Sequence, residues 1–186
     1  MELLYKEIIQ NELQQLEDTL ASSISSDINL ATEVTKHVVN SGGKRIRPVI
    51  CILVAKMLNY KGLEIIKLAS SIELLHTATL IHDDVVDQSA TRRGKESIHT
   101  KWDNAHGVLV GDFVYSKAFQ LMASFNNPEI IRILADSTNR ISEGEVLQLS
   151  LKQKEILSKE KYFEIIDRKT AELFKAAATT AGTLAS

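Results

Sequence analysis

The chain has 186 residues, of which 25% are charged, with 22 Lys and Arg against 24 Asp and Glu. This length suits one domain, and the near-neutral charge gives no reason to expect nucleic acid or an anionic membrane as the main partner. A single cysteine, Cys51, excludes a disulfide within the chain. No apolar run approaches the roughly 20 residues of a membrane helix, and the N-terminus lacks a signal-peptide pattern. We therefore expect one domain over residues 1–186 in a soluble, cytoplasmic protein.

Taken in chain order, the sequence predicts helices almost throughout, because breakers are few: two prolines and eight glycines. The predicted helices cover residues 2–20, 28–40, 48–57, 63–88, 105–125 and 129–151, followed by a last pair up to residue 186. In the first of them, Ile8, Leu13, Leu16 and Leu20 recur at roughly helical spacing. No stretch alternates as a strand would, so the chain is predicted to form an all-α bundle of about eight helices.

Three aspartates, Asp83, Asp84 and Asp87, close the longest predicted helix. A helical residue turns about 100° and rises about 1.5 Å, so Asp83 and Asp87 share a face, with His76 two turns earlier on it. Stacked carboxylates near a helix C-terminus are unfavourable, and a bound cation would relieve them. Mg²⁺ takes carboxylate oxygens together with substrate phosphates. An isolated DDxxD motif also occurs as an ordinary solvated helix end.

Two basic clusters accompany the aspartates: Arg92 and Arg93 directly after them, and Lys44, Arg45 and Arg47 after the pair Gly42 and Gly43. Arginine holds phosphate oxygens through two parallel hydrogen bonds, and glycine lets a backbone approach an anion closely. A solvated basic loop is the alternative for each cluster alone. Together with the aspartates, they predict two phosphate-bearing ligands, one bound through metal and one held by cations alone.

Five ordered segments carry a family resemblance: "GGKRIRP", "ELLHTATLIHDDVVDQSATRRGK", "GDFVYSKAFQLM", "EGEVLQL" and "RKTAELFKAAATTAG". Together they resemble the trans-polyprenyl diphosphate synthases, and most of all the bacterial octaprenyl diphosphate synthases that make the ubiquinone side chain. The resemblance implies an all-α isoprenoid synthase fold and a homodimer. It also implies Mg²⁺-dependent condensation of an allylic diphosphate, such as farnesyl diphosphate, with successive isopentenyl diphosphates.

The resemblance also implies roles for individual residues. Mg²⁺ would be held by Asp83, Asp84 and Asp87. Isopentenyl diphosphate would be bound by Lys44, Arg47, His76 and Arg93. The allylic diphosphate would be contacted by Arg92, Lys169, Thr170 and Gln148, of which Arg92 and Lys169, with the three aspartates, would act in catalysis. Arg45 and His82 match the motifs but receive no role.

Product length is expected to depend on small residues before the aspartates. Ala78 and Thr79 lie five and four positions before Asp83, and in the family large residues here accompany short products. Further along, Tyr115, Phe119 and Met122 recur at helical spacing and are candidates for the walls and floor of a product channel, or are simply core. We expect a long, octaprenyl product, with geranylgeranyl, heptaprenyl and solanesyl products as alternatives.

The family carries a second aspartate-rich motif on a later helix, and none occurs before Ser186. We therefore expect a C-terminally truncated chain that holds half of the metal site and turns over poorly alone. Three rival readings remain. The first is a terpene cyclase, which would not need the second diphosphate site. The second is a non-catalytic subunit of a heteromeric synthase, a type of protein that generally lacks the DDxxD motif. The third is a helical scaffold, which would need no metal.

Overall fold

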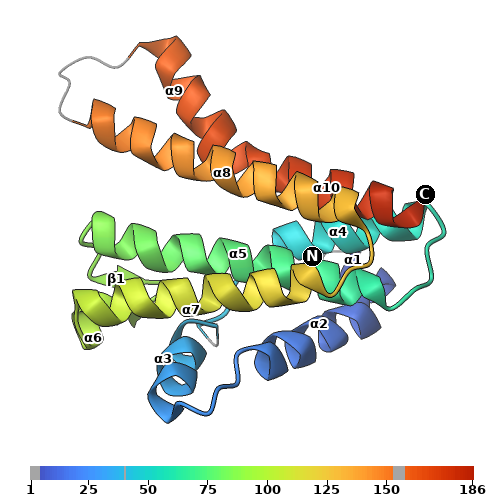
Figure 1. The fold of residues 1–186 in the computed structure, drawn as a ribbon, viewed down its shortest axis with the longest axis horizontal. Helices are drawn as coiled ribbons and strands as arrows, with labels where there is room; N and C mark the ends of the chain where they lie inside the picture. Colours follow the sequence, from blue (N-terminus) through green and yellow to red (C-terminus); the bar gives the residue numbers. More distant parts are fainter. Residues whose placement is uncertain (1–4, 40, 153–157) are drawn as a thin grey trace.

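The computed structural model describes residues 5–39, 41–152 and 158–186, and these ranges are mostly helical (Figure 1). The helices are α1 Tyr5–Ile8, α2 Gln10–Ser23, α3 Asn29–Val39, α4 Ile46–Met57, α5 Glu64–Val86, α6 Ile98–Lys101, α7 Asn104–Ala123, α8 Pro128–Leu151, α9 Lys159–Ile166 and α10 Glu172–Ala185. A π-helix, η1 Asp167–Ala171, joins α9 to α10. Strands β1 Thr91–Arg92 and β2 Lys95–Glu96 form a short antiparallel hairpin. The predicted all-α class is confirmed.

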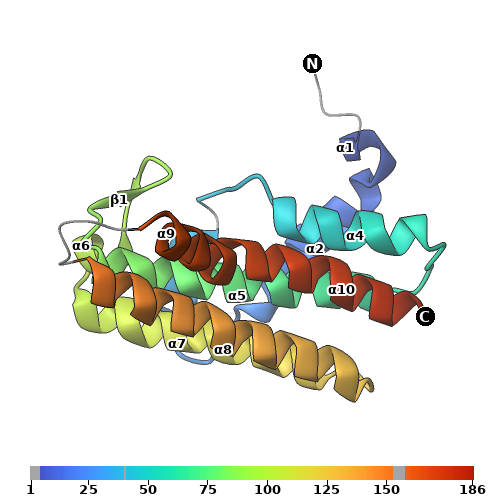
Figure 2. The ribbon, with the colours of Figure 1, turned by 90° about the horizontal axis from the view of Figure 1, so that it is seen from above.

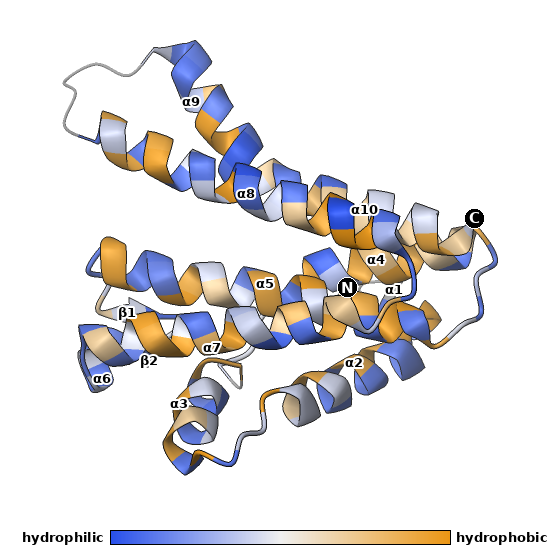
Figure 3. Cartoon of the chain, in the orientation of Figure 1, coloured by the Kyte–Doolittle hydropathy of each residue, from blue (hydrophilic) through white to orange (hydrophobic). Residues whose placement is uncertain are grey.

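Helix α5 lies at the centre of the bundle. It runs along α7 and packs against α2, α4 and α10, while α10 lies between α4 and α8 (Figures 1 and 2). Its sequence is apolar on nearly every side, which is the pattern of a helix surrounded by protein, and Leu68, Ile72 and Leu74 are fully buried. Figure 3 shows apolar residues along α5 and α10 and hydrophilic residues over much of α9. The surrounding helices therefore fix the aspartates at the C-terminal end of α5.

Helix starts follow signals that the sequence contains. The side chain of Asn127 caps α8 by accepting from two backbone amides, and Pro128 is the first residue of that helix. The hydroxyl of Ser158 accepts from the amide of Lys161 at the start of α9. Pro48 lies in the first turn of α4. Within the described part of the chain, no helix is both long and apolar enough to span a bilayer.

The prediction for the first helix was wrong in part. The start predicted at residue 2 lies outside the described residues, and the remainder divides into α1 and α2 at Ile9, whose backbone (φ −124°, ψ 24°) is not helical. This break turns Ile9 into the core, where it is fully buried, and leaves Ile8 55% exposed. Residues 94–104, which carried no predicted element, contain β2 and α6.

Candidate active site

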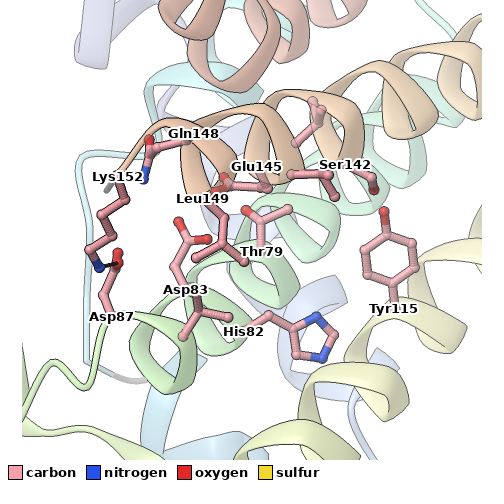
Figure 4. Close-up of a pocket in the computed structure, with 13 residues that line it drawn as sticks. Thr79, His82, Asp83, Asp87, Tyr115, Ser142, Glu145, Gln148, Leu149 and Lys152 are labelled. Atoms are coloured by element: carbon pink, nitrogen blue, oxygen red, sulfur yellow. Dashed lines mark hydrogen bonds and ion pairs between the residues drawn. The ribbon is translucent and has the colours of Figure 1, made fainter. Parts of the chain in front are cut away.

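A cavity of about 300 Å³ opens between the C-terminal end of α5, the middle of α7 and the C-terminal half of α8 (Figure 4). We name it the carboxylate cavity, and its lining residues are Thr79, His82, Asp83, Val86, Asp87, Tyr115, Ile141, Ser142, Glu145, Val146, Gln148, Leu149 and Lys152. Asp83 and Asp87 both line it, as expected for residues one helical turn apart. Apolar side chains of α8 make up much of the remaining wall. The cavity thus combines an acidic mouth with an apolar interior.

Lysine ammonium groups pair with the acidic side chains of this cavity. Lys169 Nζ lies 2.7 Å from Glu145 Oε2 and 3.3 Å from Asp83 Oδ2. Lys152 Nζ lies 3.0 Å from Asp87 Oδ1, the ion pair dashed in Figure 4. Burial raises the pKa of Glu145, and the nearby Asp83 charge raises it further. Burial alone would lower the pKa of Lys169, but its two carboxylate partners raise it, so the ammonium stays charged.

Asp84 lies on a different side of α5 from Asp83. Its carboxyl is buried, and Oδ1 accepts from Arg92 Nε at 2.9 Å and from Nη2 at 2.5 Å. The hydrogen bond to Asp84 is the main cause of a raised pKa for Arg92. This pair ties the β1–β2 hairpin to the end of α5. Of the three aspartates, Asp84 is the one that does not line the carboxylate cavity.

The cavity has the donor chemistry for a hard divalent cation, because Asp83, Asp87 and Glu145 all offer carboxylate oxygens. Within the described residues, no group of three His, Cys, Asp or Glu side chains is arranged to hold a metal ion alone. Mg²⁺ commonly binds through one or two carboxylates and completes its shell with phosphate oxygens and water. The residues therefore fit Mg²⁺ when a phosphate-bearing ligand supplies the remaining oxygens.

A second cavity, of about 580 Å³, lies further back along α5. We name it the basic pocket, and its lining residues are Ser41, Gly43, Lys44, Arg45, Ile46, Arg47, Glu73, His76, Arg93 and Phe174. They come from the loop before α4, the first turn of α4, the middle of α5, the hairpin and α10. The pocket therefore brings Lys44, Arg45 and Arg47 together with Arg93 of the second basic cluster.

Arg47 is held between a histidine and an aromatic ring. Its Nη1 lies 3.1 Å from His76 Nε2, and its guanidinium lies 4.3 Å from the centroid of the Phe174 ring. Burial, together with the charges of Arg47 and Arg93, lowers the pKa of His76 to about 3. His76 is therefore neutral at neutral pH, and its Nε2 accepts the Arg47 hydrogen. So weakly basic an imidazole is poorly suited to general-base catalysis.

Arg93 connects the β1–β2 hairpin to the loop that contains Gly42 and Gly43. Arg93 and Gly94 both have positive φ (53° and 77°), as in the two-residue turns that favour tight hairpins. The Arg93 guanidinium donates to the carbonyl of Gly42. A Cβ added at Gly43 would lie 2.9 Å from Arg93 Cζ, so the missing side chain makes room for this contact. Arg93 is thus in direct contact with the glycine pair that precedes Lys44.

Lys169 belongs to η1, which lies directly against α8, and its ammonium pairs with Asp83 and Glu145 of the carboxylate cavity. A Cβ at Gly144 of α8 would lie 2.7 Å from Arg168 Cβ and 3.0 Å from the Lys169 amide nitrogen. Glycine at this position therefore permits the close approach. Thr170, the next residue of η1, is exposed. Lys44 is also exposed, at the rim of the basic pocket.

Comparison with known proteins identifies the family. The sequence pattern named polyprenyl synthetase matches residues 28–186. The chain belongs to this family. It is 41% identical to an octaprenyl diphosphate synthase of Escherichia coli over 96% of the chain, and 40% identical to an all-trans-nonaprenyl-diphosphate synthase (geranyl-diphosphate specific) of Rhodobacter capsulatus over 95%. The chain spans 55% of the length of each relative.

Solved structures show the same fold. A polyprenyl synthase from Caulobacter crescentus, complexed with calcium and isoprenyl diphosphate, superposes with a TM-score of 0.94 at 39% identity. This match covers 97% of the chain and 55% of the Caulobacter chain. The fold is therefore that of the isoprenoid synthases, as the sequence predicted.

The family residues expected to set chain length differ in their surroundings. Thr79 lines the carboxylate cavity. Ala78 and Met122 are buried in the core, and Phe119 is 41% exposed on α7. The Phe119 ring lies 5.3 Å, between centroids, from the ring of Tyr115, which does line the cavity. Thr79 thus borders the cavity directly, and Phe119 contacts a residue that does.

Several residues that line these two pockets were not predicted from the sequence. Glu145 lies three residues before Gln148 on α8, and that helical spacing could have placed it on the same face. Glu73 likewise lies three residues before His76. Lys152 and Phe174 carried no such signal, because only the tertiary fold brings them to Asp87 and Arg47.

Proposed function

We propose that this chain carries the substrate-binding pockets of a Mg²⁺-dependent polyprenyl diphosphate synthase, in one domain over residues 1–186. The enzyme condenses an allylic diphosphate with successive isopentenyl diphosphates. The observation that carries the proposal is a pair of pockets of opposite charge along α5, one acidic and one basic. His76 and Asp83 mark them, two turns or about 10 Å of helix apart. Such a pair suits two diphosphates, one bound through metal and one through cations.

The basic pocket is proposed to bind isopentenyl diphosphate. Lys44, Arg47 and Arg93 supply positive charge, and the hydrogen bond to His76 and the Phe174 ring orient the guanidinium of Arg47. The pocket is lined by several cations and by one carboxylate, that of Glu73. Binding there needs no metal.

The carboxylate cavity is proposed to bind the allylic diphosphate at its mouth. Asp83 and Asp87 would hold Mg²⁺, and Asp84 would contribute through Arg92 in the arrangement seen here. Lys169, Thr170 and Gln148 lie on the side of α8 and η1. The prenyl tail would follow the apolar wall formed by Ile141, Val146 and Leu149. Calcium and isoprenyl diphosphate in the Caulobacter neighbour support a divalent cation beside a diphosphate.

The reaction begins when the allylic C–O bond breaks and the diphosphate leaves. Lys169 and Arg92 would stabilise the negative charge that grows on the departing oxygens, because each is a cation paired with one of the aspartates at the end of α5. Mg²⁺ bound by the aspartates would act there as a Lewis acid. The double bond of isopentenyl diphosphate then attacks the allylic carbon. The proton lost afterwards can pass to the released diphosphate, so His76 need not act as a base.

The proposed product is octaprenyl diphosphate for a quinone side chain, made by a cytoplasmic homodimer. The 41% identity to the Escherichia coli octaprenyl diphosphate synthase favours this product length. The 40% identity to the nonaprenyl relative makes a product one unit longer the next candidate. Each isoprene unit takes about one helical turn, or roughly 5 Å, so a cavity wall sets length only to about one unit. Geranylgeranyl, heptaprenyl and solanesyl products are the alternatives, and a non-catalytic subunit is the remote one.

Product sizing tests the proposal. The intact protein that carries this chain is incubated with farnesyl diphosphate, labelled isopentenyl diphosphate and Mg²⁺, and the dephosphorylated products are separated by chain length. A C40 product that disappears on chelation of Mg²⁺ is expected. A shorter or longer polyprenol would select one of the alternative lengths. Cyclic hydrocarbon formed without isopentenyl diphosphate would indicate a terpene cyclase, and no product from any allylic primer would refute the enzyme.

A further inference from the structure

Arg45 lies in the middle of the basic loop, yet its guanidinium is occupied by protein groups. Nε and Nη2 donate to the two carboxylate oxygens of Glu17 on α2, at 2.7 and 3.1 Å. Nη1 donates to Glu73 of α5 at 2.9 Å, and Nη2 also donates to the carbonyl of Val39 at 3.3 Å. Four of the five guanidinium hydrogens are therefore used. The one remaining guanidinium hydrogen cannot hold a phosphate through two parallel hydrogen bonds.

The ion pair between Arg45 and Glu73 is buried. Only 10% of the Arg45 side chain and 4% of the Glu73 side chain are exposed. Charges so far from water persist only when their hydrogen-bonding groups are satisfied, and this pair meets that condition. We call Arg45, Glu73 and Glu17 the clamp.

The clamp fixes an unfavourable backbone conformation. Arg45 has φ 49° and ψ 34°, a left-handed conformation that side-chain-bearing residues rarely adopt, at the residue before α4. Contacts to α2, α3 and α5 hold it there. Lys44 precedes it, and Arg47 lies two residues later in the first turn of the helix. The direction in which these two cations leave the backbone therefore depends on Arg45.

Glu73 also acts on the pocket through its charge. It is the carboxylate among the lining residues of the basic pocket, which Lys44, Arg45, Arg47 and Arg93 also line. Its negative charge favours the charged forms of Arg47 and Arg93, which lie close enough to oppose one another. Glu73 thus allows several cations to gather before any diphosphate is bound.

We propose that Arg45 and Glu73 are positioning residues of the isopentenyl diphosphate site: they aim Lys44 and Arg47 at the diphosphate and do not themselves touch it. This inference rests on the proposed function, because it takes the basic pocket to be a diphosphate site. It assigns a role to an arginine that the motif alone would count among the phosphate ligands.

The test compares Arg45→Met, Glu73→Met and the double variant in the intact protein. Arg45→Met leaves the buried Glu73 without its ion-pair partner, and Glu73→Met leaves Arg45 with Glu17 alone, so each is expected to lower stability. The double change refills the space with apolar groups and is expected to restore stability. In the double variant, the KM for isopentenyl diphosphate should still rise about tenfold or more, with kcat and the allylic KM within a few-fold of wild type. Arg132→Met is the matched control, because exposed Arg132 also pairs with two carboxylates, Glu129 and Asp136.

Glu73→Gln separates positioning from direct binding by the sign of its effect. If Arg45 positions the loop, weakening its anchor raises the KM for isopentenyl diphosphate. A lower KM would mean that Arg45, released from Glu73, binds the diphosphate itself, and the inference would be wrong. A double Met variant that is stable and has a wild-type KM would overturn it as well.

Calorimetric titration with inorganic pyrophosphate keeps this test independent of turnover. If the wild-type protein makes no prenyl product, the proposed function fails, but the pocket can still be examined as an anion site. Weaker pyrophosphate binding in the double variant than in Arg132→Met supports the clamp. Equal binding in these two variants, or no pyrophosphate binding by wild type, contradicts it.

Discussion

The basic pocket and the carboxylate cavity hold their charged groups in different ways. In the basic pocket, Arg45, Arg47 and Arg93 are each fixed by a buried carboxylate, by a histidine and a ring, or by a backbone carbonyl. In the carboxylate cavity, the partners of the acidic groups are the ammonium tips of Lys169 and Lys152. A lysine tip on a flexible stem is more easily displaced than a guanidinium held in a planar fork. The arrangement of charges in the basic pocket is therefore set by the fold. In the carboxylate cavity, the proposed metal and diphosphate could rearrange the charged groups.

Asp83→Ala should have the largest effect on turnover, and it should alter the carboxylate cavity while leaving the basic pocket unchanged. We expect turnover to fall by about a thousandfold, because the change removes a proposed metal ligand and a partner of Lys169. The KM for isopentenyl diphosphate should change little, since the basic pocket keeps all its contacts. Steady-state kinetics with each substrate varied separately measures both. Asp136→Ala, an exposed aspartate on α8, is the control, and near-normal turnover at saturating Mg²⁺ would exclude the role.

Gly144→Ala tests whether the carboxylate cavity depends on the close packing of η1 against α8. The added Cβ would meet Arg168 Cβ and the Lys169 amide, so we expect a loss of about 1–3 kcal/mol in stability. Displacement of Lys169 should lower turnover by about tenfold to a hundredfold.

Gly182→Ala on α10 is the matched control for Gly144→Ala. No atom of the described residues lies within 4 Å of the added Cβ, and alanine favours a helix by about 0.5–1 kcal/mol over glycine. The unfolding temperature of Gly182→Ala should therefore rise slightly or stay unchanged, and its kcat should stay at the wild-type value. Equal losses in both variants would contradict the packing argument.

Ala78→Phe and Thr79→Phe probe the apolar interior of the cavity. Both should shorten the product by about one isoprene unit or more, because a ring would occupy space along the route of the tail. Thr79→Phe should do so with less loss of stability, since Thr79 lines the cavity and Ala78 is fully buried. Phe119→Ala should change length less, as Phe119 reaches the cavity only through Tyr115. Chromatography of the polyprenols measures all three, and unchanged length in both Phe variants would refute the assignment.

His76 should make the stability of the protein depend on pH through the basic pocket. Its pKa is about 3 in the folded protein against an ordinary value of 6.5, so between these values the unfolded chain binds one more proton. The free energy of unfolding should therefore fall as the pH is lowered below 6.5, by at most about 1.4 kcal/mol per unit from this residue. His76→Gln should lose this part of the slope. Urea unfolding between pH 5 and 7 measures it, and identical slopes would show that His76 is not held neutral.

The sequence predicts most helices and the acidic face, because those features depend on neighbours along the chain. Asn127 and Ser158 begin helices where their side chains can cap them, and Asp83 and Asp87 line one cavity because helical spacing places them together. The resemblance supplies the roles of Lys44, Arg47 and His76 in the basic pocket. The helix starts and the shared face of Asp83 and Asp87 are therefore local in origin, whereas the basic pocket is assembled from separate segments of the chain.

Other features could not be predicted, because they depend on contacts between distant segments. Arg45 reaches carboxylates 28 residues away on either side, and nothing in the basic loop distinguishes it from Arg47. Lys152 meets Asp87 across 65 residues. The break at Ile9 and the π-helical conformation of η1 likewise follow from packing, since the flanking residues suit a continuous α-helix.

The π-helix η1 also sets the phase of one helical segment relative to the next. A π-helical turn contains an extra residue, so deleting one residue from Asp167–Ala171 would leave a continuous α-helix and rotate everything before it by about 100° relative to α10. Lys169 of η1 pairs with Asp83 of the carboxylate cavity, whereas the ring of Phe174 of α10 packs against Arg47 in the basic pocket. An insertion or deletion at this point would therefore change how Lys169 is oriented relative to Phe174, although the residues that line the two pockets would stay the same. Natural length variation should be tolerated in the surface loops and excluded from these five positions.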